Sequence, residues 1–302
     1  MNLPDKITLI EVGPRDGFQF EKKIIPTELK AEIICGLADA GLEHIQVTSF
    51  VHPEKVPQMA DADELIKRLP RKQGIVYSSL VLNTKGVERT HLAGLEHIEV
   101  SISASDTHSR KNSGMSFDQA FEQGREMIQL SQKYKMVVRA GIQCAFGCVY
   151  EGDIPSDRIL KTARDFKVLG IDMLAISDTT GMANPLSIKR LLEKLMPDAG
   201  DLPVVLHLHD TRGLGLANVM AAMECGVRYF DTALAGMGGC PFVTGAAGNI
   251  ATEDTAYLME SMGIATGIDI SKVAKCSSRM EEFSGKRFPG KIYKYPSINF
   301  QV

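Results

Sequence analysis

Eight short runs of apolar residues recur along the chain, and most of them lack a strict alternation with polar residues. Runs of this kind, rich in Val, Ile and Leu, are typical of parallel strands that are buried on both faces. The predicted strands span residues 7–12, 44–50, 74–82, 97–103, 136–143, 173–177, 204–209 and 228–234.

The segments between these runs have the apolar spacing of helices. In the first of them Leu29, Ile33 and Leu37 share one face, Pro26 stands near the start and Gly41 follows the end. Proline at the first turn and glycine just past the last turn are typical helix boundaries. The predicted helices span residues 26–40, 60–69, 86–93, 116–134, 155–169, 185–195, 215–225 and 249–262, with one more after residue 265.

Neighbouring parallel strands need a crossover helix between them, so eight strand–helix units predict a closed TIM (β/α)8 barrel. We expect a single catalytic domain over residues 1–302, with the barrel at about 5–265 and a short C-terminal helical extension at about 266–302. A doubly wound open sheet is the alternative. No Gly-x-Gly-x-x-Gly motif follows an early strand, and this disfavours the open sheet.

Composition and charge exclude several classes of protein. Hydrophobic residues make up 44 % of the 302 residues, enough for a large core. The net charge is −3 and no long basic run is present, so no nucleic-acid partner is expected. No apolar stretch approaches the roughly 20 residues that span a bilayer, so no membrane association is expected. Six irregularly spaced cysteines do not form a disulfide framework, and this favours a cytoplasmic protein.

Two smaller features leave alternatives open. Cys144 and Cys148 are four residues apart, but no second cysteine pair accompanies them, so we do not expect a structural zinc site. A basic cluster near the end of the chain is either a solvated surface or part of a site for an anionic group such as a nucleotide phosphate. Its members are Lys286, Arg287, Lys291 and Lys294.

The predicted strand at 204–209 ends in His207-Leu208-His209-Asp210. Residues two apart on a strand point to the same face, so the two imidazoles project side by side. Asp16, after the first strand, and Asn249, after the last, are the other candidate ligands. Two imidazoles with two oxygen donors suit Mn²⁺, Mg²⁺, Fe²⁺ or Zn²⁺. The alternative is a pair of histidines that only form hydrogen bonds at the barrel rim.

Further candidate residues follow the ends of other strands, where barrel enzymes place their sites. Arg15 lies outside the predicted helices and either stabilises negative charge or pins its loop through an acidic neighbour. Glu11 is expected to support the barrel interior. Asp178 either orients a ligand or caps a helix. Cys240 lies in a glycine-rich segment, residues 236–248, which we interpret as a lid that brings a thiol to the substrate.

These motifs resemble the 3-hydroxy-3-methylglutaryl-CoA lyases, within a wider group of barrel metallolyases that share an Asp-Arg-Glu site. The resemblance extends from about Ile7 to Gly267. The matching segments are residues 11–19 (EVGPRDGFQ), 48–50 (TSF), 56–59 (VPQM), 207–211 (HLHDT) and 238–254, which begins GGCP and ends GNIATED.

The resemblance implies a retro-Claisen reaction, in which a 3-hydroxyacyl-CoA is cleaved to acetyl-CoA and a keto acid. It implies Asp16, His207, His209 and Asn249 as ligands of a divalent cation, with Mg²⁺ or Mn²⁺ preferred. The implied catalytic residues are Arg15, which would stabilise the thioester enolate, and Cys240, His207, Asp178 and Glu253. The candidate substrate contacts are Arg15, Gln19, Gln46, Ser105, Arg139, Gly141, Gln143 and Thr179. The resemblance also implies a homo-oligomer, a dimer, and a role in leucine catabolism.

Three positions depart from the family pattern. Gln46 replaces its glutamate on the second strand, and Gly141 and Gln143 replace a tyrosine and a serine on the fifth. An amide in place of a carboxylate predicts a more positive site, and glycine in place of tyrosine predicts a larger acyl pocket. Citramalyl-CoA or a related branched hydroxyacyl-CoA is therefore an alternative substrate. A non-catalytic acyl-CoA binder and a Claisen-type synthase of the same barrel group are further alternatives.

Overall fold

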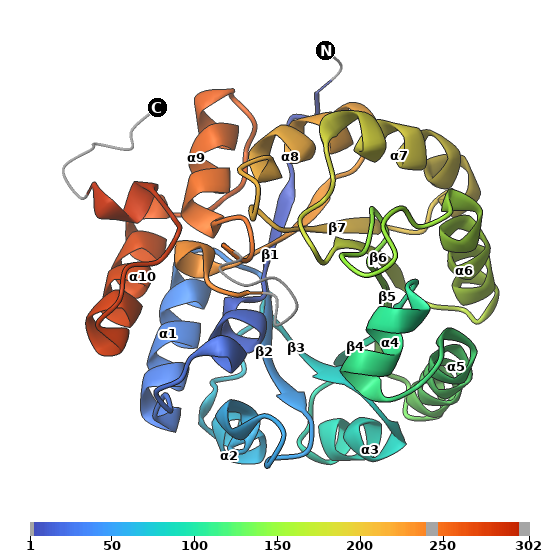
Figure 1. Cartoon of the computed structure of the whole chain (residues 1–302). Coiled ribbons are helices and arrows are strands. Elements are labelled where there is room, and N and C mark those ends of the chain that lie inside the picture. The colour runs from blue at the N-terminus through green and yellow to red at the C-terminus, as the bar shows by residue number, and fades with distance from the viewer. Residues whose placement is uncertain (1–2, 240–246, 296–302) are drawn as a thin grey trace.

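The computed structural model describes residues 3–239 and 247–295, and its strands form one closed parallel barrel (Figure 1). Each strand pairs with its neighbour in sequence, and β1 closes the ring by pairing with β8. The strands are β1 (Thr8–Glu11), β2 (His44–Phe50), β3 (Val76–Val81), β4 (His97–Ser103), β5 (Val137–Gln143), β6 (Met173–Asp178), β7 (Val204–Leu208) and β8 (Tyr229–Thr232). The predicted TIM barrel is confirmed.

Helices surround the barrel on its outer side (Figure 1). The helices that follow the strands are α1 (Thr27–Asp39), α2 (Ala62–Arg68), α3 (Thr84–Leu92), α4 (Asp106–Ser113), α5 (Phe117–Lys133), α6 (Ser156–Val168), α7 (Pro185–Ala199), α8 (Gly215–Glu224) and α9 (Thr252–Ser261). The C-terminal extension is α10 (Ile270–Ser284), which packs against α1, where the Gly36 backbone approaches the Cys276 sulfur. None of the helices in the described residues is long and apolar enough to cross a membrane.

Three local features differ from the prediction. The helix α4 was not predicted because it is polar on nearly every face, although Ser105 caps its start and Gly114, with φ +79, ends it. The helix predicted from Asn249 begins at Thr252, which leaves Asn249 in a loop. The prediction that Arg15 lies outside any helix is wrong, because Gly13–Gly17 form a single π-helical turn, η1.

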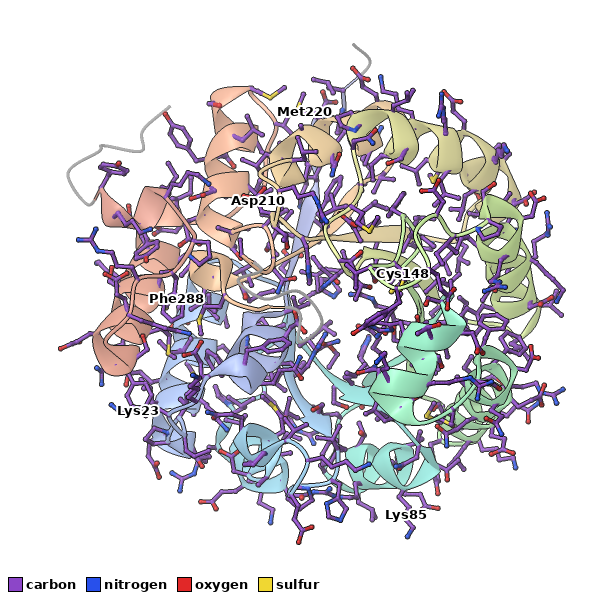
Figure 2. The ribbon with its side chains drawn as sticks, in the orientation of Figure 1. Lys23, Lys85, Cys148, Asp210, Met220 and Phe288 are labelled. Atoms are coloured by element: carbon purple, nitrogen blue, oxygen red, sulfur yellow. The ribbon has the colours of Figure 1, made fainter. Side chains whose placement is uncertain are left out.

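The apolar core lies mainly between the strands and the helices, while the barrel interior is divided into two parts. Ile10, Val12, Ala175 and Val205 form a small apolar cluster that is separate from the main core. Polar and charged side chains occupy other positions inside the barrel wall and at the ends of the strands. In Figure 2 side chains extend from the strands and the surrounding helices, with Lys85 at the outer edge of the ring and Asp210 nearer its centre.

Candidate metal centre and active site

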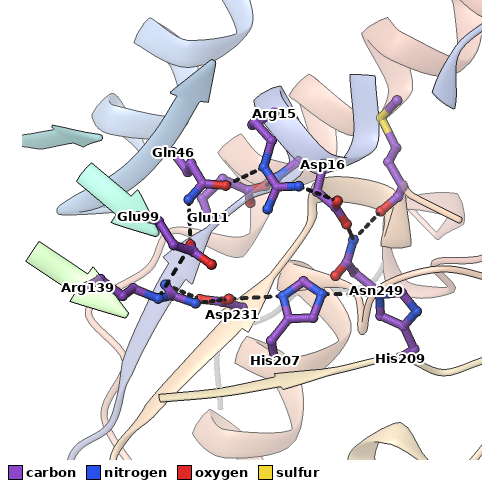
Figure 3. A network of polar contacts seen from close by, with 12 residues as sticks. Glu11, Arg15, Asp16, Gln46, Glu99, Arg139, His207, His209, Asp231 and Asn249 are labelled. Atoms are coloured by element: carbon purple, nitrogen blue, oxygen red, sulfur yellow. Dashed lines mark hydrogen bonds and ion pairs between the residues drawn. The ribbon is translucent and has the colours of Figure 1, made fainter. Parts of the chain in front are cut away.

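Asp16, His207 and His209 converge at the end of the barrel where β1 and β7 finish (Figure 3). One ligand atom from each of these residues lies within 4.8 Å of the others. The two Nε2 atoms of the histidines are 3.1 Å apart. The two imidazoles therefore share one side of the barrel wall, as the spacing of the sequence predicts.

Asn249 joins this group through the backbone. A short antiparallel bridge pairs Asn249 with His209, and its side-chain Nδ2 donates to Asp16 Oδ2 at 2.7 Å and to the Met237 carbonyl at 3.0 Å. Its Oδ1 is buried and has no hydrogen-bond partner among the described residues. A buried oxygen without a partner costs free energy unless a ligand satisfies it. The set of two nitrogens and two oxygens thus fits a divalent cation.

Asp231, on β8, was not predicted as part of the site. Asp231 Oδ2 lies 2.9 Å from His207 Nδ1, so the other ring nitrogen of His207 faces the remaining candidate ligands. These candidate ligands, Asp16, His207, His209 and Asn249, are called the metal group below. A carboxylate behind a ligand histidine fixes its tautomer and orientation. Burial opposes ionisation of Asp231, but the charge of Arg139 outweighs it and lowers the pKa of Asp231. An acidic residue inside an otherwise apolar strand was the available signal.

His209 and Asp16 have protonation states that suit metal ligands. Burial disfavours the charged form of His207, but its hydrogen bond to Asp231 outweighs this effect and raises the pKa of His207. Burial lowers the pKa of His209 to about 3, so that its imidazole stays neutral. Burial disfavours the charged form of Asp16, but the neighbouring Arg15 guanidinium outweighs this effect and lowers the pKa of Asp16. A neutral imidazole and an ionised carboxylate are the forms that bind metal ions.

The η1 turn positions Arg15 beside the metal group. Arg15 donates through Nη1 to Asp16 Oδ1 at 2.5 Å and through Nε to Gln46 Oε1. The turn is held by Glu11, whose Oε1 accepts from the Gly13 N–H at 2.7 Å. A Cβ on Gly13 would lie 2.5 Å from that oxygen, so the close approach requires glycine. Glu11 therefore has a supporting role, as expected, but it does not support the barrel interior: it accepts from the Leu234 N–H and from the Thr252 hydroxyl at the start of α9.

A wall built from β2, β4 and β5 completes the polar ring opposite the histidines (Figure 3). Gln46 Nε2 donates to Glu99 Oε2 at 2.7 Å, and Glu99 Oε2 lies 3.5 Å from Arg139 Nε. Arg139 forms a two-pronged ion pair with Asp231. Glu99 was not singled out in the sequence, although it is an acid within a predicted buried strand, residues 97–103.

Glu99 changes two expectations about this wall. The missing carboxylate at Gln46 predicts a more positive site, but the structure contradicts this because Glu99 places a carboxylate in contact with the Gln46 amide. The larger pocket predicted beside Gly141 is also wrong. A Cβ on Gly141 would lie 2.7 Å from Ser101 Oγ and 3.2 Å from Glu99 Oε1, so these side chains already occupy the space.

The other predicted substrate contacts lie at strand ends or, for Gln19, in a 3-10 turn at Phe18–Phe20, and most of them form hydrogen bonds with neighbouring protein groups. Gln19 Nε2 donates to Asp16 Oδ1 at 2.9 Å. Thr179 Oγ1 accepts from the Cys144 N–H at 2.9 Å, and Ser105 Oγ accepts from the His108 N–H at 3.1 Å. Gln143 is the last residue of β5 and is partly exposed. Gln19 is thus attached directly to the metal group.

The predicted catalytic acids Asp178 and Glu253 are both buried but differ in their hydrogen bonding. Asp178 ends β6, and its Oδ1 accepts from the Met182 and Ala183 N–H groups, while its buried Oδ2 has no partner among the described residues. Burial raises the pKa of Asp178 to about 6. Glu253 accepts from the Ala235 N–H and the Ser277 hydroxyl. Burial raises the pKa of Glu253 to about 8.

The remaining predictions concern the cysteines and the basic cluster near the end of the chain. Cys240 and residues 240–246, the centre of the predicted lid, lie outside the described residues. Cys144 and Cys148 are free thiols. In the basic cluster, Lys286 pairs with Glu21 at 2.9 Å and Lys294 Nζ donates to the Phe288 carbonyl at 2.7 Å.

Comparison with known proteins gives one consistent result. Residues 6–280 match the family model described as HMGL-like. The chain is 38 % identical over 291 residues to the hydroxymethylglutaryl-CoA lyase of Bacillus subtilis, covering 96 % of this chain and 97 % of that protein. It is 36 % identical over 290 residues to the human mitochondrial hydroxymethylglutaryl-CoA lyase, covering 96 % of this chain and 89 % of that protein.

A solved structure agrees with these sequence matches. The structure of an HMG-CoA lyase from Acinetobacter baumannii, in complex with coenzyme A and 3-methylmalate, superposes with a TM-score of 0.93. The two chains are 36 % identical, and the match covers 99 % of this chain and 97 % of that chain. The barrel and nearly all of its loops therefore have counterparts in that protein.

Proposed function

Because the chain belongs to the HMGL-like family, we propose that it is a carbon–carbon lyase that cleaves a 3-hydroxy-3-methylglutaryl-CoA-like hydroxyacyl-CoA to acetyl-CoA and a keto acid. One observation supports this reaction above all others. Asp16, His207 and His209 converge on one point, and Arg15 is bonded directly to Asp16. A cation site and a guanidinium are thus adjacent at the mouth of the barrel.

We propose that Asp16, His207, His209 and Asn249 hold a divalent cation, either Mg²⁺ or Mn²⁺. Such an ion acts as a Lewis acid on substrate oxygens and makes a hydroxyl proton easier to remove. The protein residues determine where those oxygens lie. Asp231 orients His207, and the backbone bridge to His209 holds Asn249 in place.

Arg15 is proposed to stabilise the enolate of the thioester. In the cleavage the substrate hydroxyl loses its proton, the bond between C2 and C3 breaks, and its electron pair passes to the acyl-CoA fragment as an enolate. A fixed guanidinium beside the developing oxyanion lowers the barrier because it needs no reorganisation during the reaction. The bonds from Arg15 to Asp16 and Gln46 supply that fixed orientation.

The proton steps are assigned to four further residues. Asp178 is proposed to take part in removal of the hydroxyl proton, since burial raises the pKa of Asp178 to about 6. His207 is proposed to assist this step through the metal ion that it would hold, because its ring nitrogens face Asp231 and the other candidate ligands. Cys240 is proposed to return a proton to the enolate carbon when residues 236–248 close over the substrate and exclude water. Glu253 remains a candidate in this relay, although its hydrogen bonds to Ala235 and Ser277 favour a supporting role.

The acyl end of the substrate is proposed to contact Gln19, Ser105, Gln143 and Thr179. Gln19 donates to Asp16 at 2.9 Å, which places its amide beside a proposed metal ligand. Arg139 gives both Nη atoms to Asp231, and its buried Nε has no hydrogen-bond partner among the described residues. Arg139 therefore contributes mainly through the carboxylates around it.

The test is a substrate panel with the purified protein. 3-Hydroxy-3-methylglutaryl-CoA and both enantiomers of citramalyl-CoA are incubated with Mg²⁺ or Mn²⁺, and release of acetyl-CoA is measured. We expect cleavage of at least one thioester, its loss with a chelator, and recovery when metal is restored. Cys240→Ser is expected to bind metal but lose most turnover. Binding of acyl-CoA without acetyl-CoA release from any thioester would instead support the non-catalytic binder.

We further propose a cytoplasmic homodimer that binds neither nucleic acid nor membranes and serves leucine catabolism. The names of cytoplasmic and mitochondrial relatives show that this family works in more than one compartment. Light scattering after gel filtration tests the dimer. Deletion of the gene in its host, followed by growth on leucine as carbon source, tests the metabolic role.

A further inference from the structure

A chain of side-chain contacts links Glu99, deep in the wall of the barrel, to Arg15 at its mouth. Glu99 Oε2 accepts from Gln46 Nε2 at 2.7 Å, and Gln46 Oε1 accepts from Arg15 Nε. Arg15 and Glu99 are buried, and Gln46 is 1 % exposed. The three side chains come from η1, β2 and β4, so no short segment of sequence contains this contact (Figure 3).

The chemistry of the two ends determines how the amide in the middle is oriented. A carboxylate can only accept hydrogen bonds, whereas a guanidinium can only donate them. Gln46 can satisfy both neighbours in one orientation alone, with Nε2 toward Glu99 and Oε1 toward Arg15. With an uncharged partner in place of Glu99, the amide could turn over and present its NH₂ group to Arg15, where two donors would face each other.

Glu99 forms a long ion pair with Arg139, but two observations argue that its closer partner is Gln46. Arg139 is already paired with Asp231 through both Nη atoms. Its Nε is 3.5 Å from Glu99 and has no hydrogen-bond partner among the described residues. The 2.7 Å contact to Gln46 is the shorter one.

Gly141 makes this arrangement possible. Its ideal Cβ would lie 3.2 Å from Glu99 Oε1 and 2.7 Å from Ser101 Oγ. A larger side chain on this part of β5 would force Glu99 to move. The position of Glu99 therefore depends on the absence of a side chain at Gly141, and the orientation of the Gln46 amide depends on the charge of Glu99.

We propose that Glu99 is a positioning residue of the lyase: through the Gln46 amide it fixes the orientation of Arg15 and supplies the carboxylate that position 46 lacks. This inference rests on the proposed function, because Arg15 is taken to stabilise the enolate. On this proposal the negative charge of the wall can lie at position 46 on β2 or at position 99 on β4, provided that the other of these two positions carries an amide.

A charge swap tests the proposal. Glu99→Gln keeps the shape but removes the charge, and Gln46→Glu alone places two carboxylates in contact. The double variant Gln46→Glu/Glu99→Gln restores one carboxylate, which accepts from both Arg15 and the new amide. We expect each single variant to lower kcat by about 10- to 100-fold, the cost of a misplaced catalytic group, with KM within about threefold of the original. The double variant is expected to recover most of the loss, and its coupling is obtained from the double-mutant cycle.

A second readout does not depend on turnover. The Nε–H proton of Arg15, assigned in an NMR spectrum by its loss in Arg15→Lys, is expected to exchange slowly with water in the original protein. Its exchange should become faster in Glu99→Gln and slow again in the swap. If Glu99→Gln does not fold, Glu99→Asp keeps the charge but withdraws it from Gln46, and it should show the same two losses.

The outcomes separate the inference from the proposed function. Unchanged kcat in Glu99→Gln or Glu99→Asp, or a double variant no better than Glu99→Gln, would overturn the role of Glu99 while leaving the lyase activity intact. A protein that cleaves none of the thioesters would overturn the proposed function. In that case the Arg15 Nε–H exchange still decides whether Glu99 orients Arg15 through Gln46.

Discussion

Two groups of polar side chains face each other at the end of the barrel, and they differ in how well they tolerate substitution. The side formed by η1, β7 and the loop before α9 carries Asp16, His207, His209 and Asn249, the ligand set that the family resemblance implies. The side formed by β2, β4 and β5 carries Gln46 and Gly141, where the sequence departs from the residues that the same resemblance implies.

The physical requirements of the two sides explain the difference. A metal ion needs donor atoms of particular chemistry at particular points, so a ligand cannot move to another strand without losing the site. The wall opposite needs only a carboxylate and a complementary set of hydrogen bonds around Arg15. Glu99 on β4 meets that need from a different strand, 2.7 Å from the Gln46 amide. A carboxylate that balances the charge of Arg15 can therefore come from more than one strand, whereas a metal ligand cannot.

The largest effect is expected on the metal side. His209→Ala removes one of two imidazoles and should lower kcat/KM by about 10³-fold even with added Mg²⁺ or Mn²⁺, because a bound ion contributes several kcal/mol to transition-state stabilisation. Metal content per protein, measured by mass spectrometry, should fall in parallel. His52→Ala, at an exposed position, is the matched control. If His209→Ala kept both its metal and its turnover, the metal side would not be the rigid one.

Arg15 lies where the two sides meet, and its substitution should give the next largest effect. Arg15→Lys keeps the charge but loses the planar fork that reaches Asp16 and Gln46. We expect kcat to fall by about 10²-fold, as when an oxyanion donor is removed, with metal content unchanged. Arg89→Lys, in a surface pair with Asp63, is the control. A normal kcat with a raised KM would mean that Arg15 only binds the ground state.

Gly141 tests how tightly the β2, β4 and β5 wall is packed. Gly141→Ala places a methyl group 2.7 Å from Ser101 Oγ and 3.2 Å from Glu99 Oε1. Displacement of Glu99 should lower kcat by about tenfold, and overpacking should cost about 1–3 kcal/mol of stability in a denaturant titration. In Gly124→Ala the added methyl group meets only ordinary contacts at 3.5 and 3.6 Å, so this variant controls for the substitution itself. Equal activity of the two variants would show that the wall is looser than its contacts indicate.

The smallest effect concerns a group outside the ring. Burial raises the pKa of Glu253 to about 8 from the ordinary value of 4.5. Between these pH values the unfolded chain has lost this proton while the folded protein retains it, so stability falls as the pH rises through this window. Burial raises the pKa of Glu11 to about 7, and this adds to the same trend.

Glu253→Gln removes one of these two contributions. Its Tm relative to that of the original protein is therefore expected to rise between pH 5 and pH 9, by about 2–4 °C for each kcal/mol gained. Glu88→Gln on the exposed face of α3 controls for loss of charge. A difference in Tm that stays constant with pH would contradict the assigned protonation of Glu253.

The sequence by itself predicted the barrel and the group of candidate ligands that converges at one end of it. Apolar runs without alternation can only be buried on both faces, and eight of them separated by helices lead to one closed parallel sheet. In such a sheet the C-terminal ends of the strands meet at one edge. The convergence of Asp16, His207 and His209 followed from that geometry, although these residues are far apart in the chain.

Only the tertiary structure decided what the charged residues inside the strands do. Glu99 and Asp231 are both acids within strands of the barrel, but their partners, Gln46 and Arg139, are 53 and 92 residues away in the sequence. Which side chains meet across a barrel depends on the strand register and on the space left by residues such as Gly141. Neither quantity is visible in a local pattern of hydrophobic and polar positions, because that pattern reports which face a residue occupies and not which neighbour it reaches.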